Sequence, residues 1–301
     1  GSSPPSCTKT MNKKTFKPSS ELPAGFADRQ EEELLIRDFL ISNIKKIMSK
    51  YGFQYLETPS FEYTDSIGKF LPDKERPSEG VFSFEDEKKW LSLRYDLTAP
   101  LARYSAKNFD SIPRPFKRYQ LGTVWRNEKP GPGRFREFLQ FDADYIGTSN
   151  LFADSELCFL ISEILTSCGL EKNEFIIKVS NRKLTKGLLE QLNINEEQKQ
   201  SITLRAIDKL DRVGIEGVRY LLGEGRKDKS GDFTKGAELK DNQITKIIDF
   251  LNIKKLSENN FEKIKAIANN NETMLAGINE LILIKKYFSL FNFENYNFDT
   301  T

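Results

Sequence analysis

The segment from residue 28 to residue 50 carries apolar side chains at intervals of three to four positions. These positions are Leu34, Leu35, Phe39, Leu40, Ile44 and Ile47. Acidic residues come first and lysines last, an order that the helix dipole favours. We therefore expect a long amphipathic helix that ends at Gly52 and suits packing in a dimer better than catalysis.

Shorter segments with alternating polarity follow this helix. Residues 53–66 alternate around Pro59, which predicts a strand whose proline lies at a sheet edge or an interface. Residues 81–84 and 90–94 predict a hairpin. A helix is expected to open near Thr98.

Two strands are predicted between residues 116 and 145, joined by the loop "NEKPGPGR", whose glycines allow unusual backbone dihedrals. Because strand side chains alternate between two faces, the positions sort by parity. One face holds Arg118, Gln120, Arg126, Glu128, Arg134, Arg136, Phe138, Gln140, Asp142 and Asp144. The other holds Tyr119, Leu121, Thr123, Trp125, Phe135, Glu137, Leu139, Phe141, Ala143 and Tyr145. One face is therefore polar and the other mostly apolar.

The remainder of the chain is mainly helical in its periodicity. A helix is expected at 149–167, closing at Gly169, and a strand at 174–181. From Leu184 onward Lys, Leu, Ile, Glu and Asn recur with a helical period, which the glycine-rich segment 223–236 interrupts.

These elements predict an α+β protein with an inserted domain. Residues 21–182 would form an antiparallel sheet flanked by helices, and residues 183–293 an inserted, mainly helical domain. Residues 294–301 resemble the start of a strand that returns to the first domain. Residues 1–20, which include "GSSPPSCTKT" ahead of Met11, are expected to be an expression tag or a disordered tail.

Composition narrows the possible chemistry. The 301 residues contain no histidine, which removes imidazole catalysis and histidine-ligated metals. Cys7, Cys158 and Cys168 lack metal-ligand spacing and are too few for a disulfide framework, so we expect a reducing, cytoplasmic compartment and no resident metal. The net charge of +2 does not by itself demand nucleic acid, and no apolar run is long enough to span a membrane.

The polar face of the predicted strand pair is ordered by charge. Arg126, Arg134 and Arg136 crowd one end, where forked guanidinium donors suit phosphate oxygens, and Phe138 offers a ring on which adenine can stack. At the far end of the strip, the carboxylates of Asp142 and Asp144 suit an ammonium group. Such a strip fits the activation of an amino acid by ATP. A half-solvated strand with no such role shows the same alternation and remains an open interpretation.

Several quoted segments resemble one family. The run "FKRYQLGTVWRNEKPGPGRFREFLQFDADYIG" resembles motif 2 of class II aminoacyl-tRNA synthetases, and "YGFQYLETPSFEY" resembles motif 1, which builds their dimer interface. The segment "LSLRYDLTAPLARY" resembles the amino-acid-binding segment of histidyl-tRNA synthetases. The segments "KVSNRKL", "RAIDKLDRVGIEGV" and "LLGEGRKDKSGDFTKG" look like the strand and helical insertion domain of that family in alphaproteobacteria. The resemblance covers nearly all of residues 21–301.

The resemblance implies a histidine–tRNA ligase with a class II sheet. Arg126 would hold the α-phosphate of ATP and stabilise the transition state, and the remaining ATP contacts would come from Glu128, Arg134 and Phe138. Histidine would be bound by Asp96, Thr98, Gln140 and Asp144. ATP with Mg²⁺, histidine, tRNA(His) and a second copy of the chain are the implied cofactors and partners.

The family's pattern continues with an arginine-glycine-rich strand, a tyrosine pair, motif 3 and an anticodon-binding domain, which this sequence does not contain. We therefore expect weak or absent activity from the isolated chain. A histidine-binding, non-catalytic paralogue of the type found as the regulatory subunit of ATP phosphoribosyltransferase remains an alternative, as does an RNA-binding fragment. Asp96 and Thr98 could instead cap the following helix. The basic segment 223–236 could contact tRNA phosphates or be an ordinary solvated loop.

Overall fold

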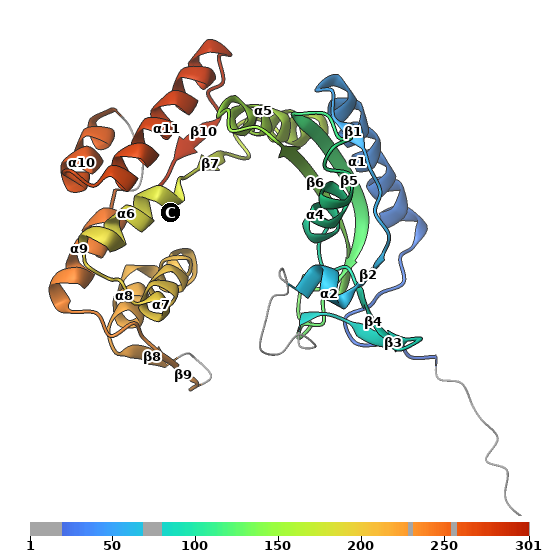
Figure 1. Cartoon of the computed structure of the whole chain (residues 1–301), viewed down its shortest axis with the longest axis horizontal. Coiled ribbons are helices and arrows are strands. Elements are labelled where there is room, and N and C mark those ends of the chain that lie inside the picture. Colours follow the sequence, from blue (N-terminus) through green and yellow to red (C-terminus); the bar gives the residue numbers. More distant parts are fainter. Residues whose placement is uncertain (1–19, 69–79, 228–230, 254–257, 301) are drawn as a thin grey trace, which may run out of the picture. The chain divides into compact units, whose positions relative to one another are not determined.

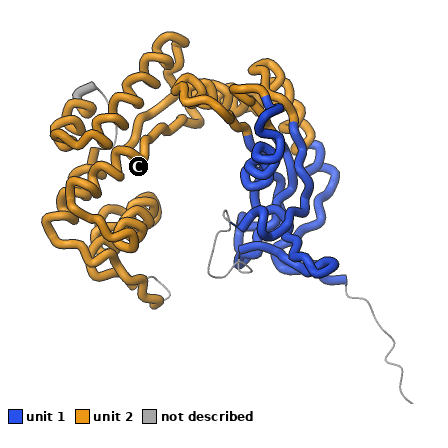
Figure 2. Tube along the Cα trace, in the orientation of Figure 1, with its two compact units in different colours: residues 1–35, 56–112, 120–142 blue, residues 36–55, 113–119, 143–301 orange. Residues whose placement is uncertain are grey.

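A computed structural model describes residues 20–68, 80–227, 231–253 and 258–300. Their contacts divide the chain into two compact units, shown in Figure 2. The first unit comprises residues 1–35, 56–112 and 120–142, and the second comprises residues 36–55, 113–119 and 143–301. The expected boundary between residues 182 and 183 remains a prediction, and the expected tail at 1–20 lies outside the described residues except for Ser20.

The first unit contains a small antiparallel sheet (Figure 1). Its strands are β2 (Phe61–Tyr63), β3 (Ser83–Asp86) and β4 (Lys89–Leu93), in the order β2-β4-β3. The predicted hairpin is confirmed as β3 and β4, which pair antiparallel. Glu87 and Lys88 connect them with φ angles of 43° and 69°. Two consecutive positive φ values are typical of a type I′ turn, whose twist matches that of the strands.

Short helices accompany this sheet in the described part of the first unit. The helices are α2 (Thr64–Ile67) and α4 (Thr98–Lys107). The start of α4 confirms the helix that was predicted to open near Thr98. Ile67, Val81 and Ala99 form a small buried cluster against which Tyr95 packs. This cluster fixes the segment that leads into α4, where the predicted histidine-binding residues Asp96 and Thr98 lie.

The second sheet has the strand order β1-β5-β6 (Figure 1). Its strands are β1 (Gln54–Tyr55), β5 (Phe116–Trp125) and β6 (Glu137–Ile146). The two strands predicted between residues 116 and 145 are therefore confirmed. The loop between them contains an antiparallel bridge from Gly131 to Arg134.

The single strand predicted at residues 53–66 was wrong. The segment instead forms two short strands, β1 and β2, in different sheets, separated by the stretch that contains Pro59. The sheet is also not wholly antiparallel, because β1 runs parallel to β5. Alternation of side chains identifies the faces of a strand but not the direction of its partner, and a parallel pair needs a long crossover connection. Residues 56–115 provide that connection.

The second unit is mainly helical. Its long helices include most of α1 (Glu31–Lys50), together with α5 (Phe152–Ser167) and α11 (Glu272–Leu290). The shorter helices are α6 (Arg182–Gln191), α7 (Glu197–Ile207), α8 (Leu210–Leu222), α9 (Asp241–Leu251) and α10 (Glu258–Ala268). The helices predicted before Gly52, before Gly169 and after Leu184 are thus confirmed within a few residues.

The second unit also contains two pairs of short strands among its described residues. The strand β7 (Ile177–Val179) pairs in parallel with β10 (Tyr296–Phe298), so a strand does form within the predicted range 294–301. Segment 223–236, which was predicted to be a loop, forms a hairpin of β8 (Gly225–Lys227) and β9 (Phe233–Lys235). The two glycine-flanked basic stretches pair as strands because Gly225 and Gly236 let the backbones approach closely.

One large hydrophobic core holds the helices of the second unit together. Leu184 and Leu188 of α6 pack with Met274, Ile278 and Leu281 of α11 as part of one buried cluster. At Gly187 a Cβ would lie 2.7 Å from that of Met274, so only glycine permits this separation of the two helices. The periodic leucines and isoleucines of the sequence therefore form a single core across helices that are distant in sequence.

Candidate functional site

Arg126 is held at the end of β5 by contacts from three neighbouring segments. Its backbone N donates to the carbonyl of Arg136 at 2.9 Å, which continues the strand pair beyond β5. Its side-chain Nε donates to the carbonyl of Tyr95 at 3.2 Å, and Nη2 donates to Oε1 of Gln140 at 3.3 Å. The guanidinium carbon lies 5.0 Å from the centre of the Phe138 ring. Arg126, Phe138 and Gln140 therefore meet at one place, as the parity of the strands predicted.

A chain of hydrogen bonds continues from Gln140. Nε2 of Gln140 donates to Oδ1 of Asp142 at 2.8 Å, and Oγ1 of Thr98 donates to Oδ2 of the same carboxylate at 3.3 Å. Thr98 belongs to α4 and Asp142 to β6, so the network joins a helix to the strand. An arginine, an amide, a carboxylate and a hydroxyl thus follow one another along one line.

Asp96 lies just before α4 and caps it. Its Oδ1 accepts a hydrogen bond from the backbone N of Ala99 at 2.9 Å. Burial raises the pKa of Asp96, and the nearby charge of Asp142 acts in the same direction, whereas the bond from Ala99 and the charge of Arg126 oppose the shift. The capping interpretation of Asp96 is therefore confirmed, and the carboxylate also lies within the electrostatic reach of Asp142 and Arg126.

The other two arginines of the loop, Arg134 and Arg136, are bonded within it. Nε of Arg134 donates to Oε2 of Glu128 at 2.8 Å, although 66% of the Arg134 side chain is exposed. Nε of Arg136 donates to the carbonyl of Glu128 at 2.9 Å, and its Nη2 donates to Oδ1 of Asn127 at 2.7 Å. The aliphatic part of Arg136 also lies against Gly25, where a Cβ would come within 2.8 Å of it.

Asp144 forms an ion pair with Arg118. It belongs to the second unit, where its Oδ2 is 3.3 Å from Nε of Arg118, a side chain with no exposed area. Buried arginines are rarely tolerated without a nearby carboxylate. Asp142, which the sequence placed beside Asp144 at the carboxylate end, is the aspartate that bonds Gln140 and Thr98.

The half-solvated interpretation fails for β5. Seven of its ten residues are buried and none is exposed, and the buried ones include Arg118 and Gln120, which have no exposed area. Strand β6 is half-buried along most of its length, with Leu139 exposed on the face that was expected to be apolar. The polar face of β5 is thus buried, and a polar face that water does not solvate requires specific partners.

Arg94 is a residue whose importance the sequence did not reveal. It is 7% exposed, and it donates from Nε to the carbonyl of Thr123 at 2.8 Å and from Nη1 to the carbonyl of Thr58 at 2.7 Å. Its own carbonyl accepts from the backbone N of Trp125 at 3.0 Å. Arg94 thereby fixes the segment that supplies the Tyr95 carbonyl to Arg126. An arginine at the end of the apolar run "WLSL" was the available signal.

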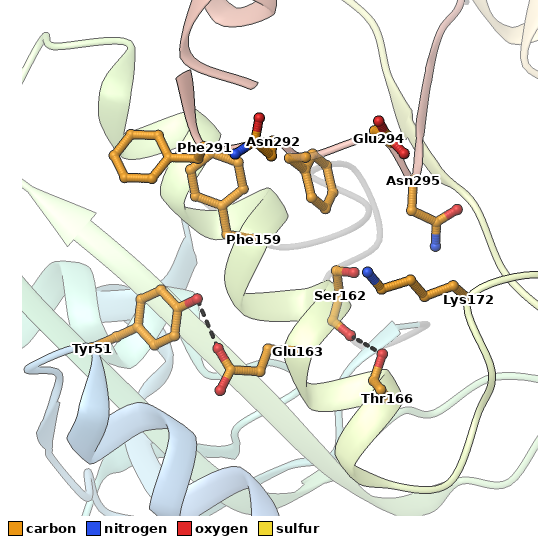
Figure 3. A pocket seen from close by; sticks show the side chains of 11 residues that line it. Tyr51, Phe159, Ser162, Glu163, Thr166, Lys172, Phe291, Asn292, Glu294 and Asn295 are labelled. Carbon is orange, nitrogen blue, oxygen red and sulfur yellow. Dashed lines mark hydrogen bonds between the residues drawn. The ribbon is translucent and has the colours of Figure 1, made fainter. Parts of the chain in front are cut away.

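A separate cavity of about 580 Å³ lies in the second unit (Figure 3). Phe159, Phe291 and Phe293 give it an apolar side, while Glu163 and Lys172 give it charge. The hydroxyl of Tyr51 donates to Glu163 at 3.0 Å, and burial together with this carboxylate raises the pKa of Tyr51. None of the residues predicted to bind ATP or histidine lines this cavity.

Two absences concern only the described parts of the chain. Among those residues, no three Cys, Asp or Glu side chains come together in a way that could hold a metal ion. Within the same residues, no helix is both long and apolar enough to cross a membrane.

Comparison with known proteins identifies the family. The sequence profile of the family described as "Histidyl-tRNA synthetase" matches residues 25–290. The chain belongs to the histidyl-tRNA synthetase family. This family is the one that the motif 1 and motif 2 segments resembled.

Relatives in the histidyl-tRNA synthetase family include alphaproteobacterial proteins. A "Histidine--tRNA ligase" of Bartonella henselae is 48% identical over 284 residues, which cover 93% of this chain and 57% of the relative. One from Rhizobium meliloti is 49% identical over 277 residues, which cover 91% of this chain and 55% of the relative. The chain therefore spans about half the length of the curated relatives that it matches.

Solved structures of similar fold include two bacterial proteins. A histidyl-tRNA synthetase from Nostoc sp. PCC 7120 has a TM-score of 0.76 at 24% identity, covering 94% of this chain and 62% of that one. A protein from Bacillus halodurans described as an ATP phosphoribosyltransferase regulatory subunit/histidyl-tRNA synthetase has the same TM-score of 0.76 at 21% identity, covering 95% and 69%. At these identities the two structures establish a shared mixed α+β fold.

Proposed function

We propose that this chain carries the histidine-activating site of a histidine–tRNA ligase, which joins histidine to ATP as histidyl-adenylate and transfers it to tRNA(His). The observation that carries the proposal is the convergence of Arg126 on Phe138 and Gln140, with Asp142 and Thr98 continuing the line. Membership of the histidyl-tRNA synthetase family supports it.

The reaction does not require a histidine side chain, which this sequence lacks. The carboxylate of the amino acid attacks the α-phosphorus of ATP and pyrophosphate leaves, so the protein mainly has to position the reactants and neutralise charge. Arg126 would hold the α-phosphate and stabilise the charge that develops on it. Its guanidinium is already oriented by the Tyr95 carbonyl and by Gln140, which lowers the cost of ordering it when substrates bind.

The remaining ATP contacts would require small rearrangements. Adenine would stack on Phe138 in place of, or opposite to, the Arg126 guanidinium that now lies over the ring. Arg134 would leave Glu128 to reach the terminal phosphates, and Glu128 would then be released to contact adenine. Mg²⁺ would accompany the phosphates, whose charge it neutralises.

Histidine would lie at the opposite end of the strip. Asp96, Thr98, Gln140 and Asp144 are the proposed contacts, and the bonds of Asp142 to Gln140 and Thr98 add a carboxylate beside them. Carboxylates and amide or hydroxyl oxygens are suitable acceptors for the α-ammonium group.

The proposed partners follow from the same family membership. Exposed apolar side chains on α1 and the strands after it support a homodimer through the motif 1 segment, since monomers rarely expose such clusters. These side chains include Ile36, Phe39 and Tyr55, which are 58%, 55% and 43% exposed. Helices α6 to α11 would form the inserted domain at 183–293, and the enzyme would act in the cytoplasm.

Ligand binding and exchange measured on the same chain test the proposal. We expect calorimetry to show selective binding of histidine among the common amino acids, and ATP binding that Arg126→Ala weakens. We expect histidine-dependent ATP–pyrophosphate exchange, where present, to fall by about a hundredfold or more in that variant. Lys129→Ala is the matched control, because Lys129 is an exposed cation of the same loop.

Each pattern of binding has a distinct meaning. Equal losses in the Arg126 and Lys129 variants would contradict the role of Arg126. Histidine binding without ATP binding would favour the non-catalytic, histidine-binding paralogue. Binding of neither ligand by the folded chain would refute both.

A further inference from the structure

A small cavity in the second unit gathers basic side chains from a helix and a hairpin. Its volume is about 230 Å³, and its lining residues are Lys209, Arg212, Val213, Leu221, Arg226 and Thr234. Lys209 directly precedes α8, and Arg212 lies in the first turn of that helix. Arg226 of β8 and Thr234 of β9 are paired opposite one another in the hairpin. Directly opposed residues of a strand pair share a face, so the hairpin presents both side chains on the same side.

The cations of this cavity have no acidic partner among the residues that the structure describes. Within the ranges that the structure describes, Lys209, Arg212 and Arg226 form no side-chain hydrogen bond or ion pair. Glu216 of α8 lies 4.0 Å from Arg219, and Glu238, which follows β9, lies 3.1 Å from Lys235. Asp211, next to Arg212 in the first turn of α8, forms no ion pair with it among the described residues. Like charges gathered around one cavity repel each other, and a bound anion would relieve this repulsion.

Local packing holds Arg226 at the wall of the cavity. A Cβ at Gly217 would lie 3.2 Å from Nη1 of Arg226, so the guanidinium rests against the backbone of α8 at a position that has no side chain. Arg226 is half-buried, whereas Lys209 and Arg212 are exposed. Val213 and Leu221 provide apolar surface beside the cations. Apolar surroundings strengthen the attraction between a fixed cation and an anion.

We propose that this cavity, lined by Lys209, Arg212, Arg226 and Thr234, binds a phosphate group. Guanidinium groups present forked donors that match phosphate oxygens, and the ammonium and hydroxyl groups add further donors. A phosphate carries more negative charge than a carboxylate and is better matched to three cations. The site does not depend on the proposed adenylate-forming activity, because it contains none of the residues assigned to that activity.

The phosphate could belong to an RNA backbone or to a free phosphorylated compound. A large aromatic side chain of α8 next to the lining residue Leu221 is exposed, namely Tyr220 by 61%. Exposed aromatic rings beside cations are typical of surfaces on which nucleic-acid bases stack. The shared chemistry in both cases is a phosphate group held by the same four side chains.

Titration with inorganic phosphate at constant ionic strength tests the site. Nuclear magnetic resonance of the arginine Nε–H groups reports contact with the anion directly. We expect saturable shifts for Arg212 and Arg226, and about tenfold weaker phosphate binding in each of the variants Lys209→Gln and Arg212→Gln. Both positions are exposed, so the variants should fold. Arg205→Gln is the control, because Arg205 of α7 is exposed but does not line the cavity.

Two results would overturn the proposal. Phosphate could fail to produce a saturable shift at Arg212 and Arg226, or Arg205→Gln could weaken binding as much as the cavity variants. Fluorescence anisotropy with a labelled RNA hairpin of about 12 base pairs then identifies the source of the phosphate. If the phosphate belongs to the RNA backbone, Arg212→Gln lowers the affinity for RNA, and inorganic phosphate competes with RNA. The slope of the logarithm of the affinity against the logarithm of the salt concentration then falls by about one in this variant. If RNA binds equally to the Arg212 and Arg205 variants while phosphate binding is lost only in the former, the source is a free phosphorylated compound.

Discussion

Replacement of Gly122 by alanine should destabilise the first unit through Arg94. A Cβ at residue 122 would lie 2.6 Å from Nη2 of Arg94 and 3.3 Å from Cδ2 of Leu97. Ordinary contacts between such atoms begin at about 3.5 Å, so the guanidinium would have to move by roughly 1 Å. Arg94 cannot move freely, because its Nε and Nη1 donate to the carbonyls of Thr123 and Thr58 at 2.8 and 2.7 Å.

The expected magnitude follows from these two bonds. A buried hydrogen bond to a charged group contributes about 1.5–3 kcal/mol, and the displacement would weaken both without removing either group. We therefore expect Gly122→Ala to lower the free energy of unfolding by about 3 kcal/mol. Gly131→Ala is the control, because no atom lies within 4 Å of its Cβ position and its φ is not positive. That control should change stability by less than about 0.5 kcal/mol.

Urea denaturation followed by tryptophan fluorescence is the assay. Trp90 and Trp125 are the two tryptophans of the chain and both belong to the first unit, so the signal reports on its unfolding. In an Arg94→Met background the close contact is gone, and Gly122→Ala should then cost less than about 1 kcal/mol. An equal cost of Gly122→Ala in both backgrounds would refute the role assigned to Arg94.

Three further predictions concern single residues. Arg103→Met should lower the free energy of unfolding by about 3 kcal/mol, because it leaves the buried carboxylate of Glu62 without its cation. The Glu62 side chain is 5% exposed and lies 2.6 Å from Nε of Arg103. Urea denaturation measures the loss, and the control is recovery of stability when Glu62→Gln is added. Burial raises the pKa of Asp96, so its contribution to stability is present below the unfolded pKa of about 3.9 and is lost as pH rises through the folded value. Asp96→Asn, which can keep the cap on Ala99, should therefore gain stability relative to the original chain as the pH rises above the unfolded pKa of about 3.9. A difference in stability that does not change with pH would contradict the raised pKa. Asn271→Ala should lower the free energy of unfolding by about 1 kcal/mol. The Asn271 side chain caps α11 by accepting a hydrogen bond from the backbone N of Met274 at 2.7 Å. Thermal denaturation checks this loss, and Asn271→Asp, which can still cap the helix, should retain most of the stability.

Much of the candidate site could be predicted because it lies on two strands that are close in sequence. Parity alone placed Arg126, Phe138 and Gln140 on one face, and the structure brings these three side chains together. The contact between Asp96 and Ala99 is also local and follows from ordinary helix capping. The pairing of Asp144 with Arg118, by contrast, depends on which residue of β5 lies beside which residue of β6. Charge order along the sequence did not specify that register.

The sequence by itself determined the types of the main elements and the faces of β5 and β6, because side-chain periodicity is a local property of the backbone. Only the tertiary structure decided that β1 runs parallel to β5, that residues 53–66 are divided between two sheets, and that β5 is buried on both faces. It also decided that Arg94 is buried and that segment 223–236 closes as a hairpin. These features depend on contacts between residues that are distant along the chain, and a pattern of polar and apolar positions does not specify the partner of each position.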